Sequence, residues 1–194
     1  MTAALALIPV AYLLGTFPSA VIVARAKGVD IHQVGSGNPG ASNVARVLGA
    51  KVGALVFLLD ALKGAIPAAT GLALGSRPGS YALIAAAVIG HMFPATRRFR
   101  GGKGAATFGG SVLVMFPLLG VGLLAAWIVI RKLTGKASLA TLAIIAGLLI
   151  GVAVRGTPAW EMAALVAIAA VVLLRHADNI RRLLGGRELS ATGQ

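Results

Sequence analysis

The sequence predicts an all-α, polytopic integral membrane protein with about seven transmembrane helices, and two observations lead to this. Of the 194 residues, 58% are hydrophobic and 12% are charged, whereas a soluble domain carries about 25% charged residues. A soluble core of this length could not bury so much apolar surface, so we expect a single membrane-embedded domain over residues 1–194. The apolar segments are roughly residues 3–24, 52–74, 80–96, 105–130, 138–154 and 158–174.

The basic residues between these segments predict the sides of the membrane. The gaps 25–51, 97–103 and 131–137 and the C-terminal tail are rich in Lys and Arg, whereas 75–79 and 155–157 hold one Arg each. Because basic residues collect in cytoplasmic loops, we expect the N-terminus outside and the C-terminus in the cytoplasm. The first segment has its basic residues after the apolar stretch, so it is expected to be a retained helix rather than a signal peptide.

The fourth segment, 105–130, would join two cytoplasmic gaps, which one crossing cannot do. Pro117 lies in its middle, and a proline breaks a helix because it lacks an amide donor and clashes with the preceding turn. We therefore predict two short helices that meet near Met115–Leu119. Each would have about 12 residues and span ~18 Å, less than the ~30 Å apolar core, so the pair is re-entrant or the bilayer thins there. Six helices with one violation of the charge rule is the alternative.

Composition also limits the function. The net charge is +13, but no basic helix with interleaved aromatic residues points to nucleic acid. There is no cysteine, and the three His and five acidic residues are not clustered, so we expect no metal site and no cofactor. A cationic excess suits anionic substrates and membrane lipid headgroups.

The first polar cluster reads GSGNPGASN, and Arg46 follows it. Glycines allow close backbone approach, consecutive amides in such turns form anion-binding nests, and arginine offers a planar fork for phosphate. The alternative is a polar loop with Gly and Asn as turn residues. The residues expected to contact a phosphate here are Gly35, Ser36, Gly37, Asn38, Asn43 and Arg46.

The second cluster, Gly101-Gly102-Lys103-Gly104, lies just ahead of a predicted helix. The unsatisfied amides and the dipole at a helix N-terminus favour an anion, and Lys103 adds a charge. The spacing is not that of a Walker A motif. His91 lies at the end of the preceding helix, where a structural hydrogen bond and a catalytic role both remain open.

The third cluster, Arg175 to Leu189, follows the last apolar segment. His176 and Asn179 are three residues apart and so share one helical face. Glu188 is expected to pair with an arginine and to fix the tail, while Arg181 and Arg182 are expected to lie on anionic lipid.

Two further features lie within or beside apolar segments. Asp60 and Lys63 are three residues apart on one helical face, and intramembrane charges usually pair, so a structural ion pair is expected. Ser138 begins a segment at the cytoplasmic face, where it either caps the helix or donates to a phosphate.

These blocks together resemble one family over nearly the whole chain, the bacterial acyl-phosphate:glycerol-3-phosphate 1-acyltransferases. The resemblance rests on four blocks in order: AYLLGTFPSAVIVARAKGVDIHQVGSGNPGASNVARVLG, LDALKGAIP, GHMFP with FRGGKGAATFGG, and RHADNIRRLLGGRE. It implies transfer of a fatty acyl group from acyl phosphate to the sn-1 hydroxyl of glycerol 3-phosphate. The products would be lysophosphatidic acid and phosphate, at the cytoplasmic face of the cell inner membrane, in the first step of phospholipid biosynthesis.

The resemblance also implies roles for individual residues. The expected catalytic set is Ser36, Arg46, Lys103, His176 and Asn179. Gly101, Gly102, Gly104 and Ser138 join the phosphate-binding set, and Glu188 is expected to be structural. An activated acyl phosphate needs no covalent enzyme intermediate, which agrees with the lack of Cys and of a Ser–His–Asp pattern.

Three matters stay open at this point. The hydroxyl proton goes either to His176 or to the phosphate of glycerol 3-phosphate, and we favour the second. The protein is expected to act as a monomer. A transporter of an anionic solute is the alternative function, but transporters usually show inverted repeats and a midplane site, whereas these polar clusters are all predicted at one face.

Overall fold

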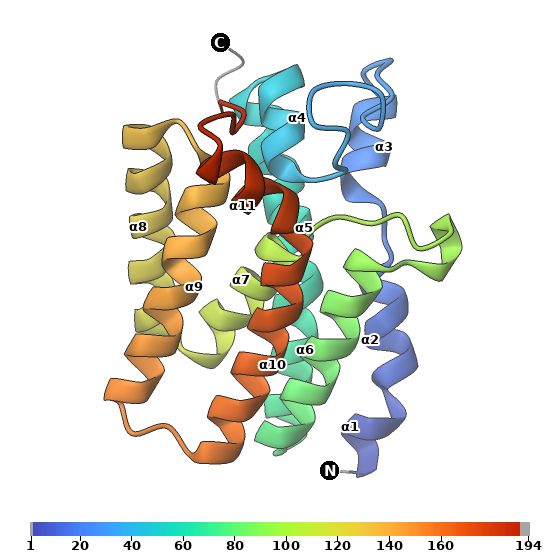
Figure 1. Ribbon diagram of the computed structural model, residues 1–194. Coiled ribbons are helices and arrows are strands. Elements are labelled where there is room, and N and C mark those ends of the chain that lie inside the picture. Colours follow the sequence, from blue (N-terminus) through green and yellow to red (C-terminus); the bar gives the residue numbers. More distant parts are fainter. Residues whose placement is uncertain (1, 191–194) are drawn as a thin grey trace.

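The computed structural model describes residues 2–190, and the regular elements in that range are helices. They form one upright bundle, with α1 at one end and α11 at the other (Figure 1). The helices are α1 (Thr2–Ala6), α2 (Ile8–Gly15), α3 (Ser19–Arg25), α4 (Ala41–Leu48), α5 (Ala50–Ala73), α6 (Arg77–Met92), the 3₁₀ turn η1 (Ala95–Arg97), α7 (Ala105–Met115), α8 (Pro117–Thr134), α9 (Ala137–Val154), α10 (Ala159–Arg175) and α11 (Ala177–Leu184).

Within the described residues, five stretches are long and apolar enough to cross a membrane. The bent pair α10–α11, with an angle of 61° between the two helices, is a sixth candidate, and α7 is a shorter apolar helix. The predicted all-α membrane fold is therefore confirmed, while its orientation stays a prediction. The five stretches are Ile8–Arg25, Ala50–Ala73, Arg77–Arg97, Pro117–Thr134 and Ala137–Val154.

The first apolar segment is broken, where the sequence suggested a continuous helix. Pro18 has no amide hydrogen, and α2 ends at Gly15 while α3 begins at Ser19. The break leaves the carbonyl oxygen of Phe17 without its helical donor, and Lys63 of α5 donates to it at 2.6 Å. Lys63 also forms the predicted pair with Asp60, at 2.5 Å, and both side chains are almost fully buried. Asp60, Lys63 and the Phe17 carbonyl thus satisfy one another inside the bundle.

The segment 105–130 does break at the predicted place, because α7 ends at Met115 and α8 begins at Pro117. The expected length is correct for α7 and wrong for α8. The 11 residues of α7 span about 16 Å and are too short for a bilayer. However, α8 has 18 residues and is long enough to cross, so the expectation of two equally short helices is wrong.

The short helix α7 lies inside the bundle against α5, and two glycines allow this. A Cβ on Gly64 would lie 1.8 Å from the carbonyl oxygen of Thr107, and a Cβ on Gly110 would lie 2.0 Å from that of Ala61. Both distances are impossible for a real side chain, so the two helix backbones touch. Small residues at such contacts are the usual means of packing helices in lipid, where the hydrophobic effect between helices is lost.

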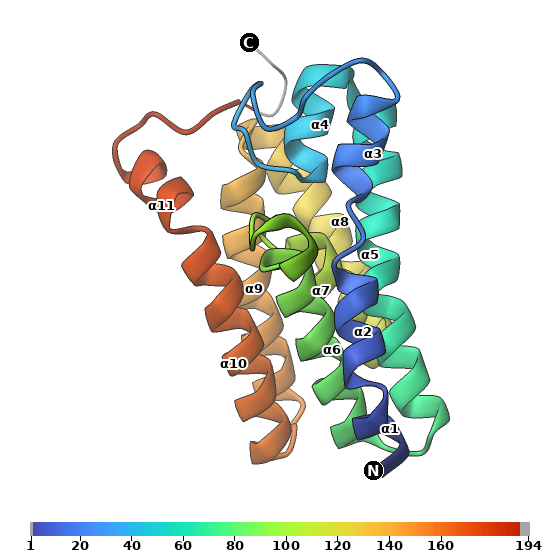
Figure 2. The ribbon, with the colours of Figure 1, turned by 90° about the vertical axis from the view of Figure 1, so that its right-hand side faces the viewer.

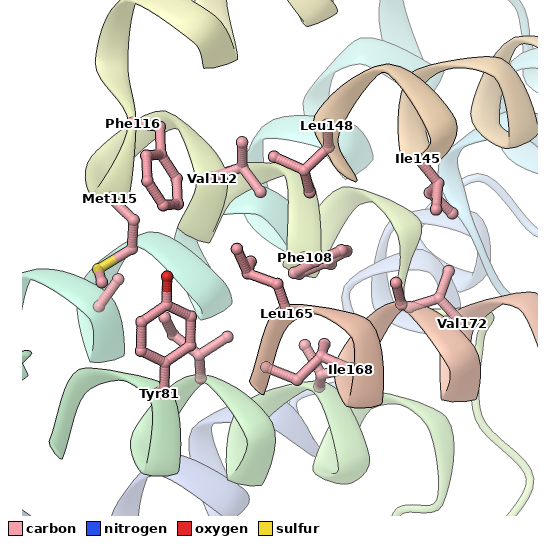
Figure 3. Packing of buried hydrophobic residues seen from close by; sticks show 14 of the residues in the cluster. Tyr81, Phe108, Val112, Met115, Phe116, Ile145, Leu148, Leu165, Ile168 and Val172 are labelled. Atoms are coloured by element: carbon pink, nitrogen blue, oxygen red, sulfur yellow. The ribbon is translucent and has the colours of Figure 1, made fainter. Parts of the chain in front are cut away.

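The largest apolar cluster lies between α6, α7, α9 and α10. Figure 3 shows Phe108 and Val112 of α7 among Leu148 of α9 and Leu165 and Ile168 of α10, in one continuous packed layer. This layer packs against one side of α7, whose other side contacts α5. The segment joining α6 to α7 lies about halfway along the bundle, below α4 and α11, rather than at the end of it (Figure 2).

Candidate active site

A cavity of about 390 Å³ lies beneath α4 and α11, between α5, α7, α8 and α9. All five residues predicted to be catalytic line it: Ser36, Arg46, Lys103, His176 and Asn179. Asn38, Asn43, Asp60, His91, Gly104, Ser138 and Glu188 line it as well. Gly35, Gly37, Lys63, Gly101 and Gly102, all in the described part of the chain, lie outside its lining. The three polar clusters and Ser138 therefore meet at one site, although up to 152 positions separate Ser36 from Glu188.

Asn43 organises the first cluster from a buried position in α4. Its side-chain oxygen accepts hydrogen bonds from the amide of Ser36 at 2.8 Å and from the Arg46 guanidinium at 3.2 Å. Its amide nitrogen donates to the carbonyls of Ile31 and Val34, at 3.3 and 3.0 Å. One side chain thus fixes both the loop and the direction of Arg46.

The expected nest of free amides in this cluster is not formed. The amide of Ser36 donates to Asn43, that of Gly37 to the carbonyl of Val34, and that of Asn38 to the Ser36 hydroxyl. Gly35 has φ +59°, and a Cβ there would lie 2.3 Å from the Asn43 side-chain oxygen. Gly35 and Gly37 therefore shape the turn, and the cluster lines the cavity through Ser36, Asn38, Ser42, Asn43 and Arg46.

The glycine loop of the second cluster also differs from the expectation. The amide of Gly102 donates to the carbonyl of His91 at 3.1 Å, so it is engaged within the protein. Gly104 has φ +77° and immediately precedes α7. The contribution of this loop to the cavity comes from Lys103 and Gly104.

Lys103 reaches across the cavity to the third cluster, where its ammonium donates to the side-chain oxygen of Asn179. Burial lowers the pKa of Lys103 to about 8, and the nearby charge of Arg182 adds to the effect. A lysine in this state is still mainly protonated at neutral pH. An anion that enters the cavity would stabilise its charged form.

Glu188 accepts hydrogen bonds from three side chains of α9 and α11 at this end of the cavity. Its Oε1 accepts hydrogen bonds from Asn179 at 2.6 Å and from the Ser138 hydroxyl at 2.8 Å, and its Oε2 accepts from Arg182 at 2.9 Å. Burial alone would raise the pKa of Glu188, but these three hydrogen bonds lower it, so the carboxylate is ionised. The predicted pairing of Glu188 with an arginine is present, and Ser138 donates to Glu188 instead of capping α9.

His176 follows the last residue of α10 and is 4% exposed. Its Nδ1 lies 2.8 Å from the carbonyl oxygen of Val172. A carbonyl only accepts, so Nδ1 carries the hydrogen and Nε2 has a lone pair in the neutral ring. Burial lowers the pKa of His176, and the neutral ring can therefore accept a hydrogen bond through Nε2.

The opposite wall of the cavity is apolar. It is formed by α5, α7, α8 and α9, and Phe57 of α5 stacks on Trp127 of α8 with ring centroids 6.2 Å apart. Trp127 is held by a hydrogen bond of 3.1 Å from its Nε1 to the Thr141 hydroxyl. The other apolar side chains of this wall include Val112, Leu113, Leu124, Ile145 and Leu148.

Charge and shape together restrict what can bind. Among the described residues, four cationic side chains line the cavity, Arg46, Lys103, Arg131 and Arg182, against the carboxylates of Asp60 and Glu188. The polar end therefore suits an anion with several oxygen acceptors, and the apolar wall suits a hydrocarbon chain.

Sequence reasoning missed three arginines, of which Arg131 is one of the cations that line the cavity. Arg182 was expected on lipid, but it lines the cavity and binds Glu188, whereas its neighbour Arg181 is exposed. The spacing of three residues from Asn179 was a signal for Arg182. Arg175 donates to the carbonyls of Gly101 and Gly102, and nothing in the sequence indicates that partner.

Comparison with known proteins gives consistent matches along the chain. The family model described as glycerol-3-phosphate acyltransferase matches residues 5–186. A glycerol-3-phosphate acyltransferase of Rubrobacter xylanophilus is 40% identical, covering 97% of this chain and 95% of the relative. Glycerol-3-phosphate acyltransferase 1 of Deinococcus radiodurans is 43% identical, with 97% and 95% coverage.

Two solved structures of the integral membrane glycerol 3-phosphate acyltransferase PlsY (YgiH) are also similar. The glycerol 3-phosphate form has a TM-score of 0.89 at 40% identity, and the lysophosphatidic acid form has 0.87 at 39%. Each comparison covers 97% of this chain and 95% of the solved chain.

Proposed function

The chain belongs to the glycerol-3-phosphate acyltransferase family, and we propose that its acyl donor is acyl phosphate and that it acylates the sn-1 hydroxyl of glycerol 3-phosphate. The observation that carries this proposal is a single cavity with several cations at one end and an apolar wall along the other. A donor with a phosphate head and a hydrocarbon tail matches both parts.

The proposed reaction needs positioning and charge rather than an enzyme nucleophile. The sn-1 oxygen attacks the acyl carbonyl carbon, the bond from that carbon to the phosphate oxygen breaks, and inorganic phosphate leaves with the electron pair. The hydroxyl proton passes to the phosphate of glycerol 3-phosphate. Since acyl phosphate is already activated, orienting the two substrates supplies much of the rate.

Two phosphate groups must lie side by side in this scheme, and their repulsion has to be offset. We assign Lys103 to the phosphate of glycerol 3-phosphate, because it is the cation of the glycine loop and is partly desolvated. Arg46 and Ser36 line the same cavity and are assigned to the donor's phosphate and acyl carbonyl. Fixed charges of this kind stabilise the developing anion without reorganising.

His176 and Asn179 are assigned to orienting the acceptor. The neutral ring of His176 offers Nε2 as an acceptor for a substrate hydroxyl, and Asn179 is already in contact with Lys103. Glu188 and Ser138 are hydrogen-bonded to each other at this part of the cavity, and Ser138 is assigned to a phosphate contact because it lines the same cavity.

The protein is a multi-pass membrane protein, and we propose that the cationic end of the cavity opens to the cytoplasm at the cell inner membrane. The basic gaps of the sequence support that orientation. We propose a monomer as the functional unit. The transporter alternative has no comparable support, since the polar clusters meet in one cavity beneath one end of the bundle.

The test uses purified protein in detergent with glycerol 3-phosphate and three donors of equal chain length: acyl phosphate, acyl-CoA and acyl carrier protein. We expect lysophosphatidic acid from acyl phosphate alone, with the acyl group at sn-1 by positional analysis of the product. Product from acyl-CoA at a similar rate would overturn the donor assignment, and 2-acyl product would overturn the regiochemistry. Reactions without protein and reactions without glycerol 3-phosphate serve as the background controls.

A further inference from the structure

The glycine loop that carries Lys103 is held from two sides. On one side it packs against the end of α6. The amide of Gly102 donates to the carbonyl of His91, and a Cβ on Gly101 would lie 2.1 Å from that same oxygen. On the other side the carbonyls of Gly101 and Gly102 point to Arg175 at the end of α10.

Arg175 donates hydrogen bonds to the carbonyls of both Gly101 and Gly102. Its terminal nitrogen donates to Gly101 at 3.1 Å and to Gly102 at 3.3 Å, and its Nε donates to Gly102 at 3.3 Å. The guanidinium carbon lies 5.2 Å from the centroid of the Phe93 ring, on the chain between α6 and the loop. A planar fork that stacks on a ring and binds two acceptors is an arginine geometry that lysine does not reproduce.

These contacts connect the glycine loop to the junction of α10 and α11. Arg175 is followed directly by His176, and Asn179 of the same segment accepts from Lys103. The loop backbone and the Lys103 side chain are therefore both fixed by the junction of α10 and α11. A basic residue at a helix C-terminus also stabilises the helix dipole, but that effect requires no contact with another segment.

We propose that Arg175 is a positioning residue, which holds the Gly101–Gly102 backbone so that Lys103 points at the phosphate of glycerol 3-phosphate. The inference rests on the proposed role of Lys103 in the acceptor site. Arg175 itself lies outside the lining of the cavity, so its hydrogen bonds act through the loop, while its charge also acts on Lys103 through space. Its removal should weaken acceptor binding and leave the donor's Michaelis constant unchanged.

The experiment is a double-mutant cycle on the dissociation constant of glycerol 3-phosphate, measured calorimetrically without any acyl donor. Arg175→Ala should raise this constant about 10-fold in the wild-type background, as expected for loss of hydrogen bonds from a charged group. In the Lys103→Ala background the same change should have an effect of about 2-fold or less, because the two residues act as one unit. The proposal would be overturned if Arg175→Ala raised the dissociation constant by the same factor in both backgrounds. It would also be overturned if Arg175→Ala left the constant unchanged in the wild-type background.

Further variants separate positioning from folding and from net charge. Arg175→Lys keeps the charge and loses the fork, and Phe93→Leu removes the ring beneath the guanidinium; both should raise the constant by a smaller factor. Should Arg175→Ala fail to fold, unchanged binding in both of these variants would overturn the proposal. Arg181→Ala removes an exposed arginine, whose side chain is 81% accessible, and should leave binding unchanged.

Binding of glycerol 3-phosphate tests the role of Arg175, whereas product formation tests the identity of the acyl donor. Wild-type protein that binds glycerol 3-phosphate but forms no product from acyl phosphate would contradict the proposed donor and leave the test of Arg175 intact. In active protein, Arg175→Ala should raise the Michaelis constant for glycerol 3-phosphate and leave that for acyl phosphate within about 2-fold.

Discussion

The ammonium group of Lys103 donates a hydrogen bond to the side-chain oxygen of Asn179, which lies 76 positions later in the chain. This contact joins the glycine loop before α7 to the first turn of α11. Asn179 in turn donates to Glu188, which also holds Ser138 and Arg182. These five side chains at the cationic end of the cavity therefore form one connected hydrogen-bond network, and changes to its members should affect substrate binding together.

Removing the charge of Lys103 should weaken acceptor binding most. Lys103→Ala is expected to raise the Michaelis constant for glycerol 3-phosphate by about 10- to 100-fold, the range for hydrogen bonds to a charged group. Steady-state kinetics at saturating acyl phosphate measures this. Lys132→Ala, which removes an exposed lysine at the end of α8, is the matched control. An unchanged constant for Lys103→Ala would remove this residue from the phosphate site.

The lowered pKa of Lys103 predicts a pH dependence. Lysine binds the phosphate in its protonated form, which is lost as the pH rises through about 8. The ratio kcat/KM for glycerol 3-phosphate should therefore fall above that pH, by about tenfold per unit at the limit. Lys103→Arg should flatten the profile up to pH 10, because arginine stays protonated. A fall of equal steepness in the arginine variant would assign the titration to another group.

Ser36→Ala should slow turnover without unfolding the protein. The loop is fixed through the backbone amide of Ser36, which donates to Asn43, and alanine keeps that amide. The lost hydroxyl lines the cavity, so we expect kcat to fall about 10-fold or more. Thr70→Ala, which removes a hydroxyl bonded to its own helix, is the control. Wild-type rates for Ser36→Ala would make the serine a turn residue only.

His176→Gln separates the two possible proton acceptors. Glutamine can still orient a hydroxyl but cannot take its proton, so an orienting role predicts a loss in kcat of about 10-fold. A general base would cost about 10²- to 10⁴-fold. We expect the smaller loss, measured at saturating concentrations of both substrates. The larger loss, with folding intact, would assign the proton to Nε2 of His176.

Asp60→Asn should lower the yield of folded protein more than the specific activity. Asp60 is 2% exposed and pairs with Lys63, and breaking a buried pair costs about 3–5 kcal/mol by leaving one charge uncompensated. Size-exclusion profiles and thermal unfolding in detergent measure the loss. The double variant Asp60→Asn/Lys63→Met removes both charges and should recover part of the yield. A normal yield with little activity would make the pair catalytic.

The membrane fold follows largely from the sequence, and its exceptions have local causes. The break at Pro117 could be predicted because proline removes a backbone donor. The length of α8 could not, because hydropathy marks where apolar residues end and not where a helix ends. Arg131 and Lys132 continue α8 to Thr134, and it stops at Gly135, which has φ +67°.

Residue type alone was enough to select candidate site residues from the sequence. The sequence did not show which backbone amides are already hydrogen-bonded within the protein. Ser36, Lys103 and His176 carry groups that suit phosphate or proton chemistry on any scaffold. The Ser36 and Gly102 amides, in contrast, were expected to bind an anion and are instead bonded to Asn43 and His91. Those partners are distant in the chain or lie on another element, so only the folded structure shows them.

We propose that three separate polar segments form one phosphate-binding site, and a crystal structure with glycerol 3-phosphate bound is the decisive experiment. We predict electron density for the phosphate group within hydrogen-bonding distance of the Lys103 ammonium, with the sn-1 hydroxyl directed toward the cavity that Ser36 and Arg46 line. A phosphate bound away from Lys103, or contacted by one segment alone, would contradict the account.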